Sequence, residues 1–143
     1  MSTLRLLLAS AAAVVIACAA PGPRAIAFGG EECAHCHMTI ADPRFAAVLL
    51  TRTGKTIAFD DAGCLARYLA SGTIPSDKVK GVWFHTFLAP DSVVAAADVR
   101  LVRSDTLRTP MGSGYAVARV GPQVAELERL VGGHAETWEE VAR

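Results

Sequence analysis

Two thiols, two imidazoles and a thioether lie within the six residues from Cys33 to Met38, which read CAHCHM. Thiolate and thioether sulfurs are ligands that Cu(I) prefers. The same residues contain C-x-x-C, the spacing of a redox dithiol, and C-x-x-C-H, the spacing at which c-type haem is attached. The segment therefore allows three chemistries: soft-metal binding, thiol–disulfide exchange and haem attachment.

Three alternatives to a soft-metal site fit the rest of the chain poorly. Small c-type cytochromes are mainly helical, although Met111 could serve as their second axial ligand. An oxidoreductase places its C-x-x-C at a helix N-terminus, where the helix dipole lowers the thiol pKa; here the acidic Glu31 and Glu32 precede it. Structural zinc needs four ligands, and His85 and His134 are isolated in the sequence.

Cu(I) is the best chemical fit, because it accepts two or three soft ligands. Residues two apart in an extended segment project to the same side, so the sulfurs of Cys36 and Met38 can converge on one ion. We expect these two residues at the centre of the site. Further candidate ligands are Cys33, His35 and His37.

Two other segments bear on this site. Met111 lies in the Pro- and Gly-rich loop 109–114 (TPMGSG), where it is either an exposed donor or a filler of the core. The segment 59–64 (FDDAGC) begins a predicted helix, on which we expect Cys64 to be a small buried side chain. Asp60 and Asp61 are expected to hold the metal loop by accepting hydrogen bonds.

The hydrophobic pattern predicts an α+β fold of two consecutive β-β-α-β units, at about residues 45–87 and 99–141. In the first unit we expect strands at 45–51, 56–59 and 79–87 and a helix ending near residue 69. In the second unit we expect strands at 99–102 and 115–120, a helix at 122–130, and a strand or helix at 134–141.

The start of the chain predicts export. Residues 1–17 combine Arg5 with an apolar run too short to span a membrane, as in a signal peptide. The run ends in VIAC, which is similar to a bacterial lipobox and makes Cys18 the candidate for lipidation. Residues 18–30 are rich in Pro and Gly and are expected to form a flexible tether. The domain would then span 31–143, periplasmic and anchored to the cell membrane, with the outer membrane favoured.

Charge excludes one class of partner. Without residues 1–17 the chain keeps 13 Lys and Arg against 14 Asp and Glu, so it has no electrostatic footprint for nucleic acid. If Cys18 carries lipid, three thiols remain. An odd number of thiols in an oxidising compartment indicates reactive or metal-bound cysteines.

Together these motifs resemble the NosL family, exported lipoproteins similar to copper chaperones for nitrous oxide reductase. The resemblance covers nearly all of the mature chain. It rests on Cys18, C-x-x-C-x-M-x-I (Cys33, Cys36, Met38, Ile40), FDDxxC (Phe59 to Cys64), Trp83, TPMGSG (Thr109 to Gly114), and the end of the chain (Gly132-Gly133, Trp138 to Val141).

The resemblance implies a topology similar to organomercurial lyase and the binding of one Cu(I). It implies delivery to the tetranuclear copper–sulfide centre of nitrous oxide reductase or to a related copper enzyme, without enzymatic turnover. The family's ligands map onto Cys36, Met38 and Met111. His37 stands where relatives commonly carry glycine, so it either adds a ligand or changes the copper pool that the protein serves.

Overall fold

The computed structural model describes residues 22–143. The signal peptide, Cys18 and the first part of the tether lie outside these residues, so the expectations for them stay predictions. Within the described part, none of the helices has the length and apolar character needed to cross a membrane.

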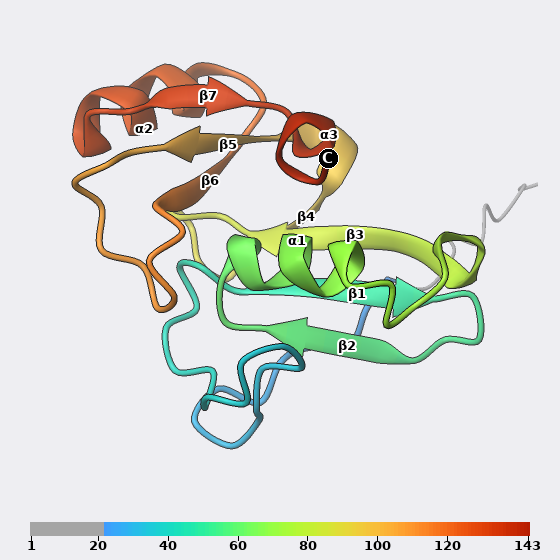
Figure 1. Cartoon of the computed structure of the whole chain (residues 1–143). Helices are drawn as coiled ribbons and strands as arrows, with labels where there is room; N and C mark the ends of the chain where they lie inside the picture. Colours follow the sequence, from blue (N-terminus) through green and yellow to red (C-terminus); the bar gives the residue numbers. More distant parts are fainter. Residues whose placement is uncertain (1–21) are drawn as a thin grey trace, which may run out of the picture.

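The first unit is a four-stranded antiparallel sheet with one helix packed on it (Figure 1). The strands are ordered β2-β1-β3-β4, and β1 is buried along its whole length. The elements are β1 (Ala47–Thr51), β2 (Thr56–Phe59), α1 (Ala62–Ala70), the short 3-10 helix η1 (Ser76–Lys78), β3 (Val79–His85) and β4 (Val93–Ala95).

The second unit repeats this plan with a three-stranded antiparallel sheet, ordered β6-β5-β7. After the 3-10 helix η2 (Ala96–Asp98) come β5 (Val99–Arg103), β6 (Tyr115–Arg119), α2 (Pro122–Val131), β7 (His134–Glu136) and α3 (Trp138–Val141). In each unit the first strand lies between the other two strands of its β-β-α-β motif. The predicted α+β fold with two such units is confirmed.

The differences from the predicted elements are small. The last segment, expected to be a strand or a helix, contains both, because Thr137 caps α3 in a capping box with Glu140. The first strand begins at Ala47 and the third ends at His85, each two residues inside the predicted range. The three-residue strand β4 was not predicted, since it is too short to show a period.

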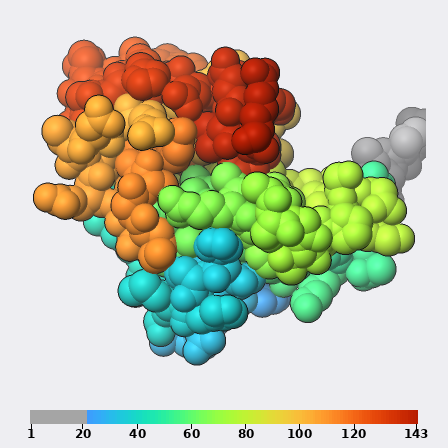
Figure 2. Space-filling model, viewed as in Figure 1, coloured from blue at the N-terminus to red at the C-terminus, as the bar shows by residue number. Residues whose placement is uncertain are grey.

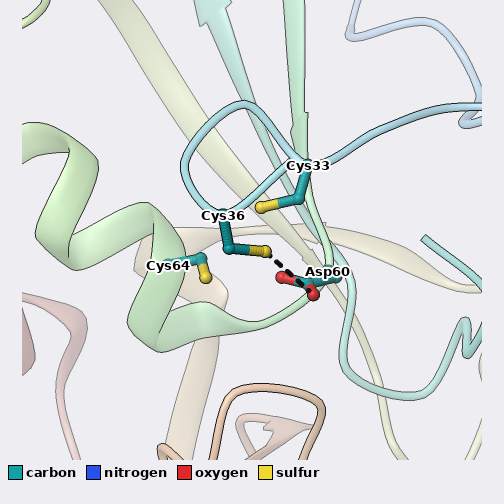
Figure 3. A group of neighbouring side chains, drawn as sticks. All are labelled: Cys33, Cys36, Asp60 and Cys64. Carbon is teal, nitrogen blue, oxygen red and sulfur yellow. Dashed lines mark hydrogen bonds between the residues drawn. The ribbon is translucent and has the colours of Figure 1, made fainter. Parts of the chain in front are cut away.

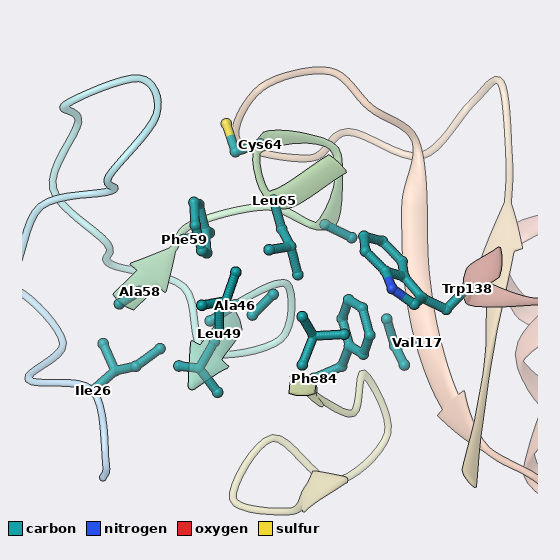
Figure 4. Close-up of a cluster of buried hydrophobic side chains, with 14 of the residues drawn as sticks. Ile26, Ala46, Leu49, Ala58, Phe59, Cys64, Leu65, Phe84, Val117 and Trp138 are labelled. Atoms are coloured by element: carbon teal, nitrogen blue, oxygen red, sulfur yellow. The ribbon is translucent and has the colours of Figure 1, made fainter. Parts of the chain in front are cut away.

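The two units share one hydrophobic core (Figure 4). Phe84 of β3 and Trp138 of α3 meet edge to face, with ring centroids 5.0 Å apart. Leu65 of α1 and Val117 of β6 are buried in the same cluster. Each large side chain buried here contributes about 1.5–3 kcal/mol. The space-filling view shows the orange and red second unit stacked on the green first unit (Figure 2).

The folded body begins before residue 31. Ile26 is buried in the core, and Arg24 forms an ion pair with Glu31 at 2.6 Å. The main-chain N–H of Arg24 donates to the hydroxyl of Thr56 on β2. Part of the segment that we assigned to the tether is therefore packed against the first sheet.

Candidate metal centre

The residues from Cys33 to Met38 form a closed loop rather than an extended segment. The N–H of Cys33 donates to the carbonyl of Met38 at 2.9 Å, and the N–H of His37 donates to the carbonyl of Cys33 at 3.0 Å. His37 has φ of 63°, in the left-handed region that favours glycine. The extended geometry that we used to pair Cys36 with Met38 is therefore wrong, because the chain turns between these residues.

This loop is fixed to the first sheet where β2 leads into α1. The N–H of Ala34 donates to the carbonyl of Ala58 at 3.0 Å, which holds the cysteine loop beside the end of β2. Asp61 caps α1 by accepting the N–H of Gly63 at 2.6 Å. Because the cap residue Asp61 directly follows Asp60, α1 begins at Ala62, and its first turn places Cys64 beside the cysteine loop (Figure 3).

Three sulfurs and a carboxylate meet at this junction (Figure 3). One donor atom from each of Cys33, Cys36, Asp60 and Cys64 lies within 4.8 Å of the other three. We call these four residues the donor cluster. Cys33 and Cys64 are fully buried, Asp60 is 2% exposed, and Cys36 is half-buried. The cluster can therefore be reached from solvent on the side of Cys36.

The environment of Cys33 favours its thiolate. The side chain of Cys64 and the main chain of Cys36, Asp60 and His35 form hydrogen bonds that outweigh burial and lower the pKa of Cys33 to about 4. The hydrogen bond with Cys33 raises the pKa of Cys64 far above its ordinary value. Burial is the largest cause of the raised pKa of Cys36. The environment of the cluster therefore favours the thiolate at Cys33 and the protonated thiol at Cys64 and Cys36.

Asp60 is the second unusual group of the cluster. Burial, followed by its hydrogen bond and charge interaction with Cys33, raises its pKa to about 6. One carboxylate oxygen accepts a hydrogen bond from the Cys36 thiol at 3.4 Å, whereas the other is buried without a partner. Leaving a buried polar atom unpaired costs about 1–3 kcal/mol. A cation among the three sulfurs would offset this cost, so the cluster fits a thiophilic metal ion.

The loop of Met111 is fastened to the same helix end from the second unit. The N–H of Met111 donates to Asp61 at 3.3 Å, across 50 residues of sequence. A Cβ on Gly63 would lie 2.5 Å from the Cβ of Ser113, so glycine is needed for this close approach. Met111 is half-buried and packs against the shared core.

The structure divides the candidate ligands into two groups. Cys33 and Cys36 belong to the donor cluster, together with Cys64, which we had expected to be only a buried core residue. His35 and His37 lie on the cysteine loop and do not belong to the cluster, and His37 is exposed. Met38 lies on the same loop and is 54% exposed. The missed signal for Cys64 was its place in the first helical turn after Asp60.

The aspartates behave as hydrogen-bond acceptors around the cysteine loop and the Met111 loop. Asp61 accepts N–H groups of Gly63 and Met111. Asp60 accepts the thiol of Cys36, and its free oxygen makes it a candidate ligand as well.

Fold and cluster define a small α+β protein with a cysteine-rich candidate metal centre. Its structure is similar to the crystal structure of the copper chaperone NosL from Shewanella denitrificans, with a TM-score of 0.68 and 21% sequence identity. The alignment covers 84% of this chain and 96% of that one. The resemblance inferred from the motifs is thus confirmed at the level of the fold. Comparison with protein-family models and with curated proteins gives no match.

Proposed function

We propose that this protein is a metallochaperone that binds one Cu(I) ion in the donor cluster and passes it to a copper-accepting enzyme. One observation carries the proposal: three cysteine sulfurs and a buried carboxylate oxygen lie within 4.8 Å of one another. Sulfur-rich sites favour Cu(I). The fold is similar to that of a copper chaperone, which supports the choice of copper.

Within the cluster, Cys33 is the thiolate that anchors the ion. It is fully buried and has a low pKa, so little free energy is needed to deprotonate it. Cys64 lies on the buried side of the cluster and Cys36 on the open side. Copper is exchanged through Cys36, with Met38, Met111, His35 and His37 as transient donors around it.

The two rival functions agree less well with the geometry. Covalent haem attachment needs both cysteines of Cys33-x-x-Cys36 accessible, whereas Cys33 is 0% exposed and its sulfur faces Cys64. A thiol–disulfide oxidoreductase needs an accessible thiolate. Here the thiol with the low pKa is buried, and the more exposed Cys36 has a raised pKa.

The proposed cellular role follows from the start of the sequence and the resemblance. The protein is exported to the periplasm, anchored by lipid on Cys18, and delivers copper to nitrous oxide reductase or a related copper enzyme. It carries out no enzymatic turnover. Its similarity to a protein described as a chaperone supports a carrier function.

Titration of the reduced protein with Cu(I) against a chromophoric competitor tests the proposal. We expect tight one-to-one binding, and Cys33→Ser is expected to weaken it by more than the roughly 10–100-fold typical of losing an outer hydrogen-bond partner. The double variant Met38→Leu/Met111→Leu is expected to retain tight binding and to slow the transfer of copper to an acceptor. Unchanged affinity in Cys33→Ser would refute the cluster as the site, and a covalent haem spectrum would refute the chaperone function.

A further inference from the structure

A second concave surface lies on the seam between the two units, apart from the donor cluster. It is a groove of about 780 Å³ to which none of the four cluster residues contributes. This volume is within the range of roughly 300–1,000 Å³ common for small-molecule sites. In Figure 2 the dark red helix α3 borders the green and yellow-green surface of the first unit. The apolar side chains that line the groove are Leu69, Ile74, Val79, Val82, Trp83 and Trp138.

The floor of the groove has a defined shape. The indole of Trp83 lies over Gly81, where a Cβ would come within 3.0 Å of the ring. Three small residues, Ala95 to Ala97, line the groove as well. Trp138 is only 7% exposed, so its ring forms part of the wall and does not protrude. The surface is therefore suited to receive an apolar group rather than to insert into a bilayer.

The N-terminal end of the described chain is connected to this groove through one shared lining residue. Gly22 lines a small depression together with Lys80, and Lys80 also lines the groove. Cys18 precedes Gly22 by four residues, which span at most about 14 Å when extended. A group attached to Cys18 is therefore within reach of the groove.

We propose that the groove binds an acyl chain of the lipid attached to Cys18. This inference rests on the lipid anchor of the proposed function. An acyl chain is long, narrow and apolar, and it requires no hydrogen-bond partners. A groove lined mainly by apolar side chains, several of them small, matches these properties.

Tryptophan fluorescence gives a direct test, because both tryptophans of the chain line the groove. Bromine quenches indole emission on contact. We expect a brominated fatty acid to quench the unlipidated Cys18→Ser chain in a saturable manner with one site. Ala96→Phe in that chain fills the groove and is expected to weaken quenching by roughly tenfold or more. The matched control Ala125→Phe, at an exposed position of α2 outside the groove, is expected to leave quenching unchanged.

A second experiment identifies the source of the acyl chain in the groove. The lipidated protein is placed in vesicles of phosphatidylcholine whose acyl chains are brominated. We expect little quenching, because the groove already holds the protein's own unbrominated chain. Strong quenching would show that the groove takes a chain from the bilayer and would overturn the assignment to Cys18.

Two further outcomes would also overturn the proposal. One is quenching in the first experiment that does not saturate or is equal in Ala96→Phe and Ala125→Phe. The other is a dimer of the Cys18→Ser chain that Ala96→Phe dissociates, which would make the groove an interface between copies. The Cu(I) affinity of Ala96→Phe, measured in the same preparation, is expected to equal that of the parent chain. This measurement distinguishes a failure of the acyl-chain proposal from a failure of the proposed copper binding.

Discussion

The two units have the same order of strands and helix, yet only the first carries the donor cluster. In the first unit, the junction between strand and helix contains Asp60, and Cys64 is the third residue of α1. At the corresponding junction of the second unit, Val120 precedes the cap of α2, and Val124 is the third residue of the helix. The β-β-α-β architecture therefore does not require these donors, which points to a functional reason for their presence in the first unit.

The second unit contributes to the site in another way. Its first two strands, β5 and β6, are separated by the long loop that contains Met111, whereas β1 and β2 are joined by a short turn. The long loop reaches across to Asp61 and Gly63 of the first unit. The first unit thus supplies the buried donors, and the second unit supplies the Met111 loop that packs beside them.

Exchanging the residues at the third helical position tests this division most strongly. Cys64→Val places in α1 the residue that α2 carries at the same position. We expect the Cu(I) affinity to fall by more than the roughly 10–100-fold that follows the loss of a residue hydrogen-bonded to a metal ligand. The reciprocal Val124→Cys is expected to add no second Cu(I) site, because among the described residues the donor cluster is the one group of three or more His, Cys, Asp or Glu side chains found close together. Competitor titration measures both variants. Affinity within a few-fold of the parent in Cys64→Val would remove this residue from the site.

Asp60→Asn is expected to raise the stability of the metal-free protein and to weaken its metal binding. Since burial raises the pKa of Asp60 to about 6, the ionised carboxylate destabilises the metal-free fold. Folding stability is lost as the pH rises from about 4, where Asp60 ionises in the unfolded chain, to about 6, where Asp60 ionises in the folded chain. At pH 7 the amide is expected to raise the free energy of unfolding by about 1–3 kcal/mol.

Urea unfolding at several pH values checks this prediction. The gain should vanish near pH 4 and be complete above pH 6, while competitor titration should show weaker metal binding at pH 7. A gain of equal size at pH 4 and pH 7 would contradict the electrostatic explanation.

Gly63→Ala tests the close contact between α1 of the first unit and Ser113 in the Met111 loop of the second unit. Alanine usually stabilises a helix relative to glycine, but here its methyl group would meet Ser113. We expect a net loss of about 1–3 kcal/mol in thermal or urea unfolding. The corresponding Gln123→Ala in α2 is expected to change stability by no more than about 0.5 kcal/mol. Adding Ser113→Gly to Gly63→Ala should restore most of the loss, and no restoration would argue against this contact.

The fold could be predicted from the sequence because local patterns specify most of its elements. A continuous apolar run predicted β1, and Pro122 and Gly132 marked the ends of α2. The site was predicted only where its donors are neighbours in sequence, as for Cys33 and Cys36. Cys64 joins them through long-range packing of α1 on the cysteine loop, which no local pattern reveals. The turn at His37 was missed because only a few per cent of residues other than glycine adopt a positive φ.

The hydrogen bond from Ala34 to Ala58 has a consequence for when copper can be taken up. It joins the cysteine loop to the end of β2, so the sulfurs of Cys33 and Cys64 come together only after these separate segments have docked. A ligand that binds the folded state alone raises its stability by mass action, by about 4 kcal/mol at a thousand times its dissociation constant. The unfolded chain therefore does not present the assembled donor cluster. Loading of a metal ion would follow folding, and the bound ion would then stabilise the folded state.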